Sequence, residues 1–174
     1  IARTERRGVA EPESVPDHHH ESMEDVIRIL LSAPILEGVE SSTAKILAYA
    51  GDQQRYESGE VIMHEGETGE DCCFVLEGVA EVSVGEGAAR RVVAALGPGE
   101  VIGETALLLD VPRSATVTAR EDLRLLSLSR DLFCDLLRKD DQFGIAMMRT
   151  LARRLVETTT SRKLESPQAQ GGQA

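Results

Sequence analysis

The chain has 174 residues, a formal net charge of −11 at pH 7 and only 3% aromatic residues, with no tryptophan. This composition argues against a nucleic-acid-binding protein, because net negative charge repels a phosphate backbone and single-stranded nucleic acids stack on aromatic rings. The length suits one domain with tails, and the hydrophobic content of 41% is that of an ordinary globular protein.

The sequence lacks the pattern of a membrane-spanning helix and that of a secretory signal. No apolar run approaches the roughly 20 residues that cross a bilayer, and residues 1–22 are too polar for a signal peptide. We therefore expect a cytoplasmic protein, or the cytosolic part of a larger protein such as a membrane protein. The chain begins with Ile1 instead of methionine, which favours a piece of something longer.

Residues 1–22 are interpreted as a flexible arm, because prolines and acids interrupt them and no apolar periodicity is present. We assign no metal to the run His18–His20, since adjacent side chains in a flexible segment do not converge on one ion. The cysteines lack zinc-site spacing, and we expect reduced, buried thiols at Cys72, Cys73 and Cys134. No metal and no other cofactor is predicted.

Two helices are predicted after the arm. Apolar residues recur at helical spacing after Ser22, and Pro34 ends this first helix. Ser41 or Ser42 is expected to cap a second helix, which runs up to Gly51.

Residues 56–128 have a different texture, in which short β-prone segments are separated by glycine turns. This spacing predicts an antiparallel β-barrel or jelly roll, so the fold class is mainly β with flanking helices. Residues 105–109, Thr-Ala-Leu-Leu-Leu, are the exception: their composition favours a helix of about one turn between two strands.

Helical periodicity returns after the β-rich region. Apolar residues then recur at steps of four, a pattern more typical of a core or dimer interface than of ligand contact. They are Phe143, Met147, Leu151 and Leu155. The arginines Arg149, Arg153 and Arg154 are expected on a solvated face. The domain is expected to span residues 23–160, with a disordered tail at 161–174.

The segment VIGETALLLDVPRSATV at residues 101–117 carries the chemistry. Gly103 stands before the short helix, whose free N–H groups attract an anion, and Pro112 ends a turn that brings Arg113 back beside the same helix start. The planar guanidinium of Arg113 can bind two oxygens of one phosphate. Glu104 only accepts hydrogen bonds when ionised, so its partner is a donor such as a sugar hydroxyl. Together they describe a site for ribose and phosphate.

These residues resemble the phosphate-binding cassette of the cyclic nucleotide-binding domain family, and the glycine-marked strands around them are similar to that family over residues 35–156. The resemblance implies a β-barrel with lid helices, Glu104 on the ribose 2′-hydroxyl and Arg113 on the cyclic phosphate, with backbone donors from residues 105–107. The implied ligand-binding residues are Ile102, Gly103, Glu104, Thr105, Ala106, Leu107, Arg113, Ser114, Ala115 and Val117.

The resemblance also implies a choice of ligand. The family tends to use Thr after the cassette arginine for cGMP and Ala for cAMP, and Ser114 lies between them, which gives cAMP a slight preference over cGMP. Ile102 stands where the family often has an aromatic residue. We further expect the ligand to draw the helix at residues 140–155 toward the barrel.

Several other functions remain open. Glu104 and Arg113 could form a structural salt bridge, and the chain could be a structural module with an empty pocket. It could also be the sensor domain of a transcription regulator without its DNA-binding part. A resemblance to a kinase regulatory subunit is a further alternative, because Arg6–Val9 faintly resembles the inhibitory segment of such a subunit. Catalysis is not predicted, since His64 is the only histidine in the β-rich region. The expected partners are a cyclic nucleotide, no nucleic acid, and an output domain or a second copy.

Overall fold

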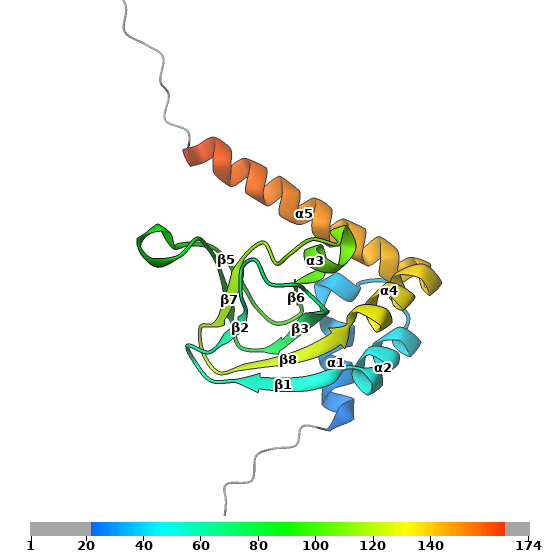
Figure 1. Ribbon diagram of the computed structural model, residues 1–174. Helices are drawn as coiled ribbons and strands as arrows, with labels where there is room; N and C mark the ends of the chain where they lie inside the picture. Colours follow the sequence, from blue (N-terminus) through cyan, green and yellow to red (C-terminus); the bar gives the residue numbers. More distant parts are fainter. Residues whose placement is uncertain (1–21, 166–174) are drawn as a thin grey trace, which may run out of the picture.

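The computed structural model describes residues 22–165 (Figure 1). The helices are α1 (Met23–Ser32), η1 (Pro34–Leu36), α2 (Ser41–Ala50), η2 (Gly87–Ala89), α3 (Glu104–Leu109), α4 (Arg130–Lys139) and α5 (Asp141–Glu165). The strands are β1 (Asp52–Tyr56), β2 (Val61–Met63), β3 (Asp71–Glu77), β4 (Ala80–Val84), β5 (Arg91–Leu96), β6 (Val101–Ile102), β7 (Thr116–Ala119) and β8 (Leu123–Ser129). The predicted arm before Ser22 and the predicted tail after Glu165 lie outside these residues. Among the described helices, none is long and apolar enough to cross a membrane.

The two N-terminal helices form where the sequence predicted them. Ser22 caps α1 through a capping box with Asp25, and the next helix, η1, starts at Pro34, where a proline is tolerated because its missing N–H would be unpaired anyway. The predicted cap of α2 is wrong: Glu40 occupies the cap position, and its side chain makes no capping hydrogen bond. Gly51 ends α2, as expected.

Two four-stranded antiparallel sheets make up the β region, in the orders β1-β8-β3-β6 and β2-β7-β4-β5. This arrangement confirms the predicted fold class, mainly β with flanking helices. The β region nevertheless begins earlier than predicted, at Asp52 instead of Tyr56. Strand β1 reads Asp-Gln-Gln-Arg-Tyr and lies at the edge of its sheet with much of its surface exposed, so it shows no apolar alternation.

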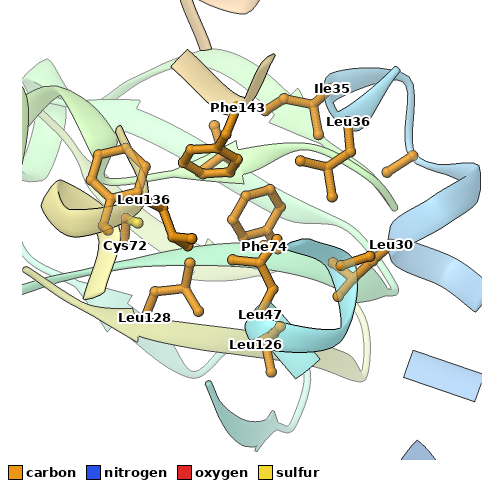
Figure 2. Close-up of a cluster of buried hydrophobic side chains, with 14 of the residues drawn as sticks. Leu30, Ile35, Leu36, Leu47, Cys72, Phe74, Leu126, Leu128, Leu136 and Phe143 are labelled. Carbon is orange, nitrogen blue, oxygen red and sulfur yellow. The ribbon is translucent and has the colours of Figure 1, made fainter. Parts of the chain in front are cut away.

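The sheet containing β3 and β8 is buried on both faces. One face packs against the helices, and Figure 2 shows Phe74 and Leu126 among Leu30, Leu47 and Phe143 in this helical core. The other face packs against the second sheet in a barrel core. Successive strand residues point to opposite faces, so neighbouring residues of one strand contribute to different cores.

The cysteines follow this alternation. Cys72 belongs to the helical core and Cys73 to the barrel core, and both are free thiols. Burial raises the pKa of the Cys72 thiol well above its ordinary value and raises that of Cys73 to about 12. The prediction of buried thiols holds for both, whereas Cys134 is only half-buried.

Helices α4 and α5 complete the fold and meet at Asp140. The Asp140 carboxylate accepts hydrogen bonds from the first turn of α5 and from Thr43 of α2, which anchors the junction to the N-terminal helices. The apolar stripe of α5 divides along its length, since Phe143 is fully buried and Leu155 is 68% exposed. Figure 1 shows α5 passing α3 and running out beyond the barrel. The helix continues to Glu165, so residues 161–165, predicted as tail, are helical.

Candidate functional site: the cassette cavity

A cavity of about 110 Å³ lies between the cassette and the barrel core. Its lining residues are Met63, Val82, Leu96, Ile102, Gly103, Glu104, Thr105, Ala106, Arg113, Ser114, Ala115, Val117 and Arg154. Every predicted ligand-binding residue is among them except Leu107. The Leu107 side chain is buried in the helical core, where it fixes α3 to the body of the domain.

Gly103 shapes the entrance to α3. Its φ of 83° lies in the left-handed region, which glycine adopts at little cost because it has no Cβ atom. A Cβ atom at this position would overlap the Arg113 guanidinium and lie 3.0 Å from Met63. The residue is therefore required both by the backbone turn and by the close approach of the arginine. Helix α3 starts at Glu104, one position before the predicted start.

The guanidinium of Arg113 is buried and held from two sides. Nη1 donates to the Gly103 carbonyl at 2.9 Å, and Nη2 donates to Asp71 at 2.6 Å. Asp71 in turn accepts from the hydroxyl of Ser127 at 2.8 Å. Only 7% of the Arg113 side chain is exposed, so the charge is fixed in place at the cavity wall.

Glu104 is the second buried charge, with 2% of the residue exposed. Its Oε1 atom accepts from Nη1 of Arg154 at 2.7 Å and from the hydroxyl of Thr105 at 3.3 Å. Glu104 and Arg113 do not pair in this structure, because each has a partner of its own. The structural salt bridge between them, considered from the sequence, is thus not what the geometry shows.

Arg154 was predicted on a solvated face, and that prediction is wrong. Its side chain is 28% exposed, lines the cavity and donates to both Glu104 and the Val101 carbonyl. A signal for this placement exists in the sequence: Met147, Leu151 and Arg154 follow one another at helical steps of four and three, so they share a face of α5. Asp71, the partner of Arg113, was also missed, because it lies on β3, 42 residues before Arg113 in the chain.

The far end of the cassette is tied to α4. Asp110 ends α3 with a φ of 53°, a left-handed conformation that Asp tolerates better than most residues. Arg130 at the start of α4 donates to Asp110 at 3.2 Å and to the Gly69 carbonyl at 2.7 Å. Because Asp110 is exposed, its ion pair with Arg130 contributes little, whereas the bond to Gly69 is partly buried.

The charges of the site balance before any ligand is bound. Two carboxylates, Asp71 and Glu104, face two guanidinium groups, Arg113 and Arg154. Such a site can accept one phosphate at Arg113 and one hydroxyl at Glu104. Apolar side chains line the rest of the wall, and they suit the face of a planar base. Within residues 22–165, no cluster of His, Cys, Asp and Glu is arranged to hold a metal ion.

Known proteins match both the sequence and the fold. The sequence profile of the family described as "Cyclic nucleotide-binding domain" matches residues 53–140. A cAMP-dependent protein kinase regulatory subunit of Yarrowia lipolytica is 41% identical over 121 residues, which make up 69% of this chain and 31% of that protein. The chain thus spans less than a third of the length of this relative.

Two solved structures support the same relationship. The regulatory domain of Toxoplasma gondii PKA, crystallised with cAMP, is 31% identical with a TM-score of 0.59, over 65% of this chain and 43% of that chain. The catabolite activator protein of Thermus thermophilus is 30% identical with a TM-score of 0.67, over 75% of this chain and 62% of that chain. The profile match and these relatives show that the chain belongs to the cyclic nucleotide-binding domain family.

Proposed function

We propose that this chain is a sensor module that binds a 3′,5′-cyclic nucleotide, with cAMP favoured, and that ligand binding acts through α5 on a partner or a fused output domain. Glu104 and Arg113 carry this proposal. They are two buried side chains of opposite charge that line one cavity and are each held by a separate partner.

The chemistry of a cyclic nucleotide fits this pair. A cyclic phosphate carries one negative charge, and the fixed guanidinium of Arg113 offsets the cost of taking that charge out of water. The Glu104 carboxylate accepts from a ribose hydroxyl, and the hydroxyl of Ser114 is available at the cavity wall for the phosphate. The base then lies against apolar residues such as Val82 and Leu96.

The cavity is small for a cyclic nucleotide. A volume of about 110 Å³ is below the roughly 300–1,000 Å³ typical of ligand sites, so a cyclic nucleotide would fill the cavity and extend beyond it. Arg154 lines the cavity from α5, outside the cassette and the barrel. We therefore expect α5 to be the part of the cavity wall that moves most when a ligand binds. A ligand that binds one position of α5 better than another shifts the balance between them.

The Yarrowia relative favours one kind of output. The Yarrowia protein is a kinase regulatory subunit, and we propose a protein kinase as the partner in preference to a DNA-binding domain. The arginine pair in Arg6–Val9, which resembles an inhibitory segment, lies outside the described residues. Domains of this family are regulatory and non-catalytic, so we propose no enzymatic activity for this chain. We also propose a cytosolic location.

Calorimetric titration of the chain tests the ligand. We expect cAMP to bind, and cGMP to bind with similar or lower affinity, because Ser114 lies between the Thr and the Ala that are typical of a strong preference. The hydrolysed nucleotide 5′-AMP is the control, since it keeps the base and phosphate but lacks the cyclic ester. Tighter binding of cGMP by more than tenfold, about 1.4 kcal/mol, would reverse the predicted order. Failure to bind any cyclic nucleotide would favour a structural module.

Hydrogen exchange tests the response of α5. Saturating cAMP is expected to slow amide exchange over residues 141–156, because the ligand adds contacts to a helix that exposes Leu155 and Val156. Residues of α4 are the internal control, since the α4–α5 junction at Asp140 is anchored to Thr43. Equal exchange over residues 141–156 with and without ligand would show that α5 does not report binding.

A further inference from the structure

The β2–β3 loop (residues 64–70) holds the main chain of Arg113. The N–H of Arg113 donates to the Glu67 carbonyl, and the Arg113 carbonyl accepts from the Gly66 N–H, both at 2.8 Å. Neither bond belongs to a sheet or a helix. The place of Arg113 in the cassette therefore depends on the place of this loop.

The end of the same loop lies against the guanidinium of Arg113. A Cβ atom added at Gly69 would lie 3.0 Å from Cζ of Arg113 and 2.9 Å from the Cβ atom of Ala106, so the loop passes the charged group as closely as a backbone can. Asp71, whose carboxylate accepts from Nη2 of Arg113 at 2.6 Å, is the second residue after Gly69 and begins β3. A displacement of this end of the loop would move the packing surface and the carboxylate partner of Arg113 together.

Arg130 of α4 fixes this end of the loop. Its Nη2 atom donates to the Gly69 carbonyl at 2.7 Å, and its backbone N–H donates to the Glu70 carbonyl at 2.8 Å. Its Nη1 atom donates to Asp110 at 3.2 Å, but the Asp110 side chain is 89% exposed, so water weakens that ion pair. The bonds to the loop are thus the stronger contacts, and they hold the two residues that come just before Asp71.

The attachment of α4 to the sheet does not explain this placement of the Arg130 side chain. Strand β8 leads directly into α4 and pairs with β3, so that Ser129 lies opposite Asp71. Backbone pairing therefore already holds the start of α4. The guanidinium adds a bond to Gly69, the loop residue that packs against Arg113. Arg130 itself is not among the residues that line the cavity.

We propose that Arg130 is a positioning residue of the phosphate site, which acts through the β2–β3 loop to hold Arg113 in place before the ligand arrives. This inference rests on the proposed function, because that function assigns the phosphate to Arg113. A cationic side chain that is already ordered binds an anion without losing further conformational freedom, so preorganisation of Arg113 raises the affinity. Loss of the Arg130 side chain leaves the lining of the cavity unchanged but lets Arg113 and its carboxylate partner move.

Titration with cAMP measures the effect on affinity. The chains compared are the parent, Arg130→Ala, Arg130→Lys, Asp110→Asn and Arg138→Ala. Arg130→Ala is expected to weaken cAMP by about 3- to 10-fold, the effect of having to order one long side chain at binding. Arg138→Ala is the matched control, because it removes the same charge from the same helix, where Arg138 is 69% exposed; it should leave the affinity unchanged.

The two remaining variants separate the contacts of Arg130. Arg130→Lys should recover part of the affinity, because an ammonium group can donate to the Gly69 carbonyl but cannot hold Gly69 and Asp110 with a planar fork. Asp110→Asn should bind cAMP nearly as the parent does, since the ion pair that it removes is exposed.

The NMR signals of Arg113 in the ligand-free chain separate positioning from general stability. A guanidinium whose nitrogens are held by separate acceptors rotates slowly, so its N–H groups give resolved signals, which the Arg113→Lys variant identifies by their loss. We expect these signals to shift and broaden in Arg130→Ala and to stay unchanged in Arg138→Ala. A loss of stability alone would lower the melting temperature without changing the Arg113 signals of the folded chain.

Gly69→Ala tests the loop without changing Arg130. The φ of Gly69 is outside the left-handed region, so the added Cβ atom brings only the close contacts with Ala106 and Arg113. This variant should weaken cAMP and shift the Arg113 signals. Gly97→Ala is its control, because an added Cβ atom at Gly97 meets nothing within 4 Å, and it should have neither effect.

The outcomes that overturn this inference differ from those that overturn the ligand assignment. If folded Arg130→Ala keeps either the parent's cAMP affinity or the parent's Arg113 signals, Arg130 has no positioning role, although the parent still binds cAMP. If Arg130→Ala does not fold, parent-like affinity in both Arg130→Lys and Gly69→Ala contradicts the role. If the parent chain binds neither cAMP nor cGMP, the proposed function fails and the phosphate role of Arg130 fails with it.

Discussion

Arg113→Ala should lower the affinity for cAMP by tens to thousands of times. The Arg113 side chain is 7% exposed, and it is the cationic group of the cavity that lies where the phosphate is expected. Without it, the phosphate anion would be buried with only backbone donors and the Ser114 hydroxyl as partners. Truncating one member of a buried charged pair costs on the order of 2 to 5 kcal/mol, and about 1.4 kcal/mol corresponds to a factor of ten. Calorimetry at one fixed salt concentration measures the loss.

Arg113 also has a structural role, which the controls must separate from ligand binding. Its bonds to Gly103 and Asp71 join the cassette to β3, so we expect Arg113→Ala to lose some stability as well. Circular dichroism must remain native for the affinities to be comparable. Arg113→Lys should recover part of the affinity, since an ammonium cannot reproduce the two-pronged contact. Glu104→Gln should cost less than Arg113→Ala, because an amide oxygen still accepts from a hydroxyl. Parent-like cAMP binding by folded Arg113→Ala would refute the assignment of the cassette.

The cassette could be predicted from the sequence because its two charged residues lie close together along the chain. Glu104 and Arg113 stand on either side of a short helix and a proline turn, and the turn alone brings them to one place. Leu107 was expected to contribute its backbone N–H, and the segment did not reveal that its side chain points to the helical core instead of the cavity. The direction of a side chain on a one-turn helix depends on what packs behind it, which the local sequence does not reveal.

The partners of Arg113 and Glu104 could not be predicted from the local sequence. Asp71 meets Arg113 through the pairing of strands, and Arg154 meets Glu104 through the path of α5, so both contacts depend on the register and direction of distant elements. Strand β1 was missed for a different reason. Its polar side chains reflect its place at the sheet edge, and backbone pairing with β8 holds it there without an apolar pattern.

Gly103→Ala should lower both the stability of the domain and its affinity for cAMP, although it adds a single methyl group. The left-handed backbone at this residue costs a non-glycine residue roughly 1–2 kcal/mol. The added Cβ atom would also overlap Nη1 of Arg113, and Met63 is packed closely on the other side. The arginine must therefore move, which breaks its bond to the Gly103 carbonyl and displaces the charge from the phosphate position. We expect a loss of cAMP affinity comparable to that of Arg113→Ala.

Gly59→Ala is the matched control, because it separates the backbone strain from the overlap. Gly59 has a φ of 90°, also in the left-handed region, but an added Cβ atom there meets nothing within 4 Å. Gly59→Ala should therefore lower the melting temperature by a few degrees, about 2–4 °C for each kcal/mol in a chain of this size, and leave cAMP affinity unchanged. Gly103→Ala should lower both quantities. If folded Gly103→Ala binds cAMP as tightly as Gly59→Ala does, the close approach of Arg113 to this glycine does not set the geometry of the phosphate site.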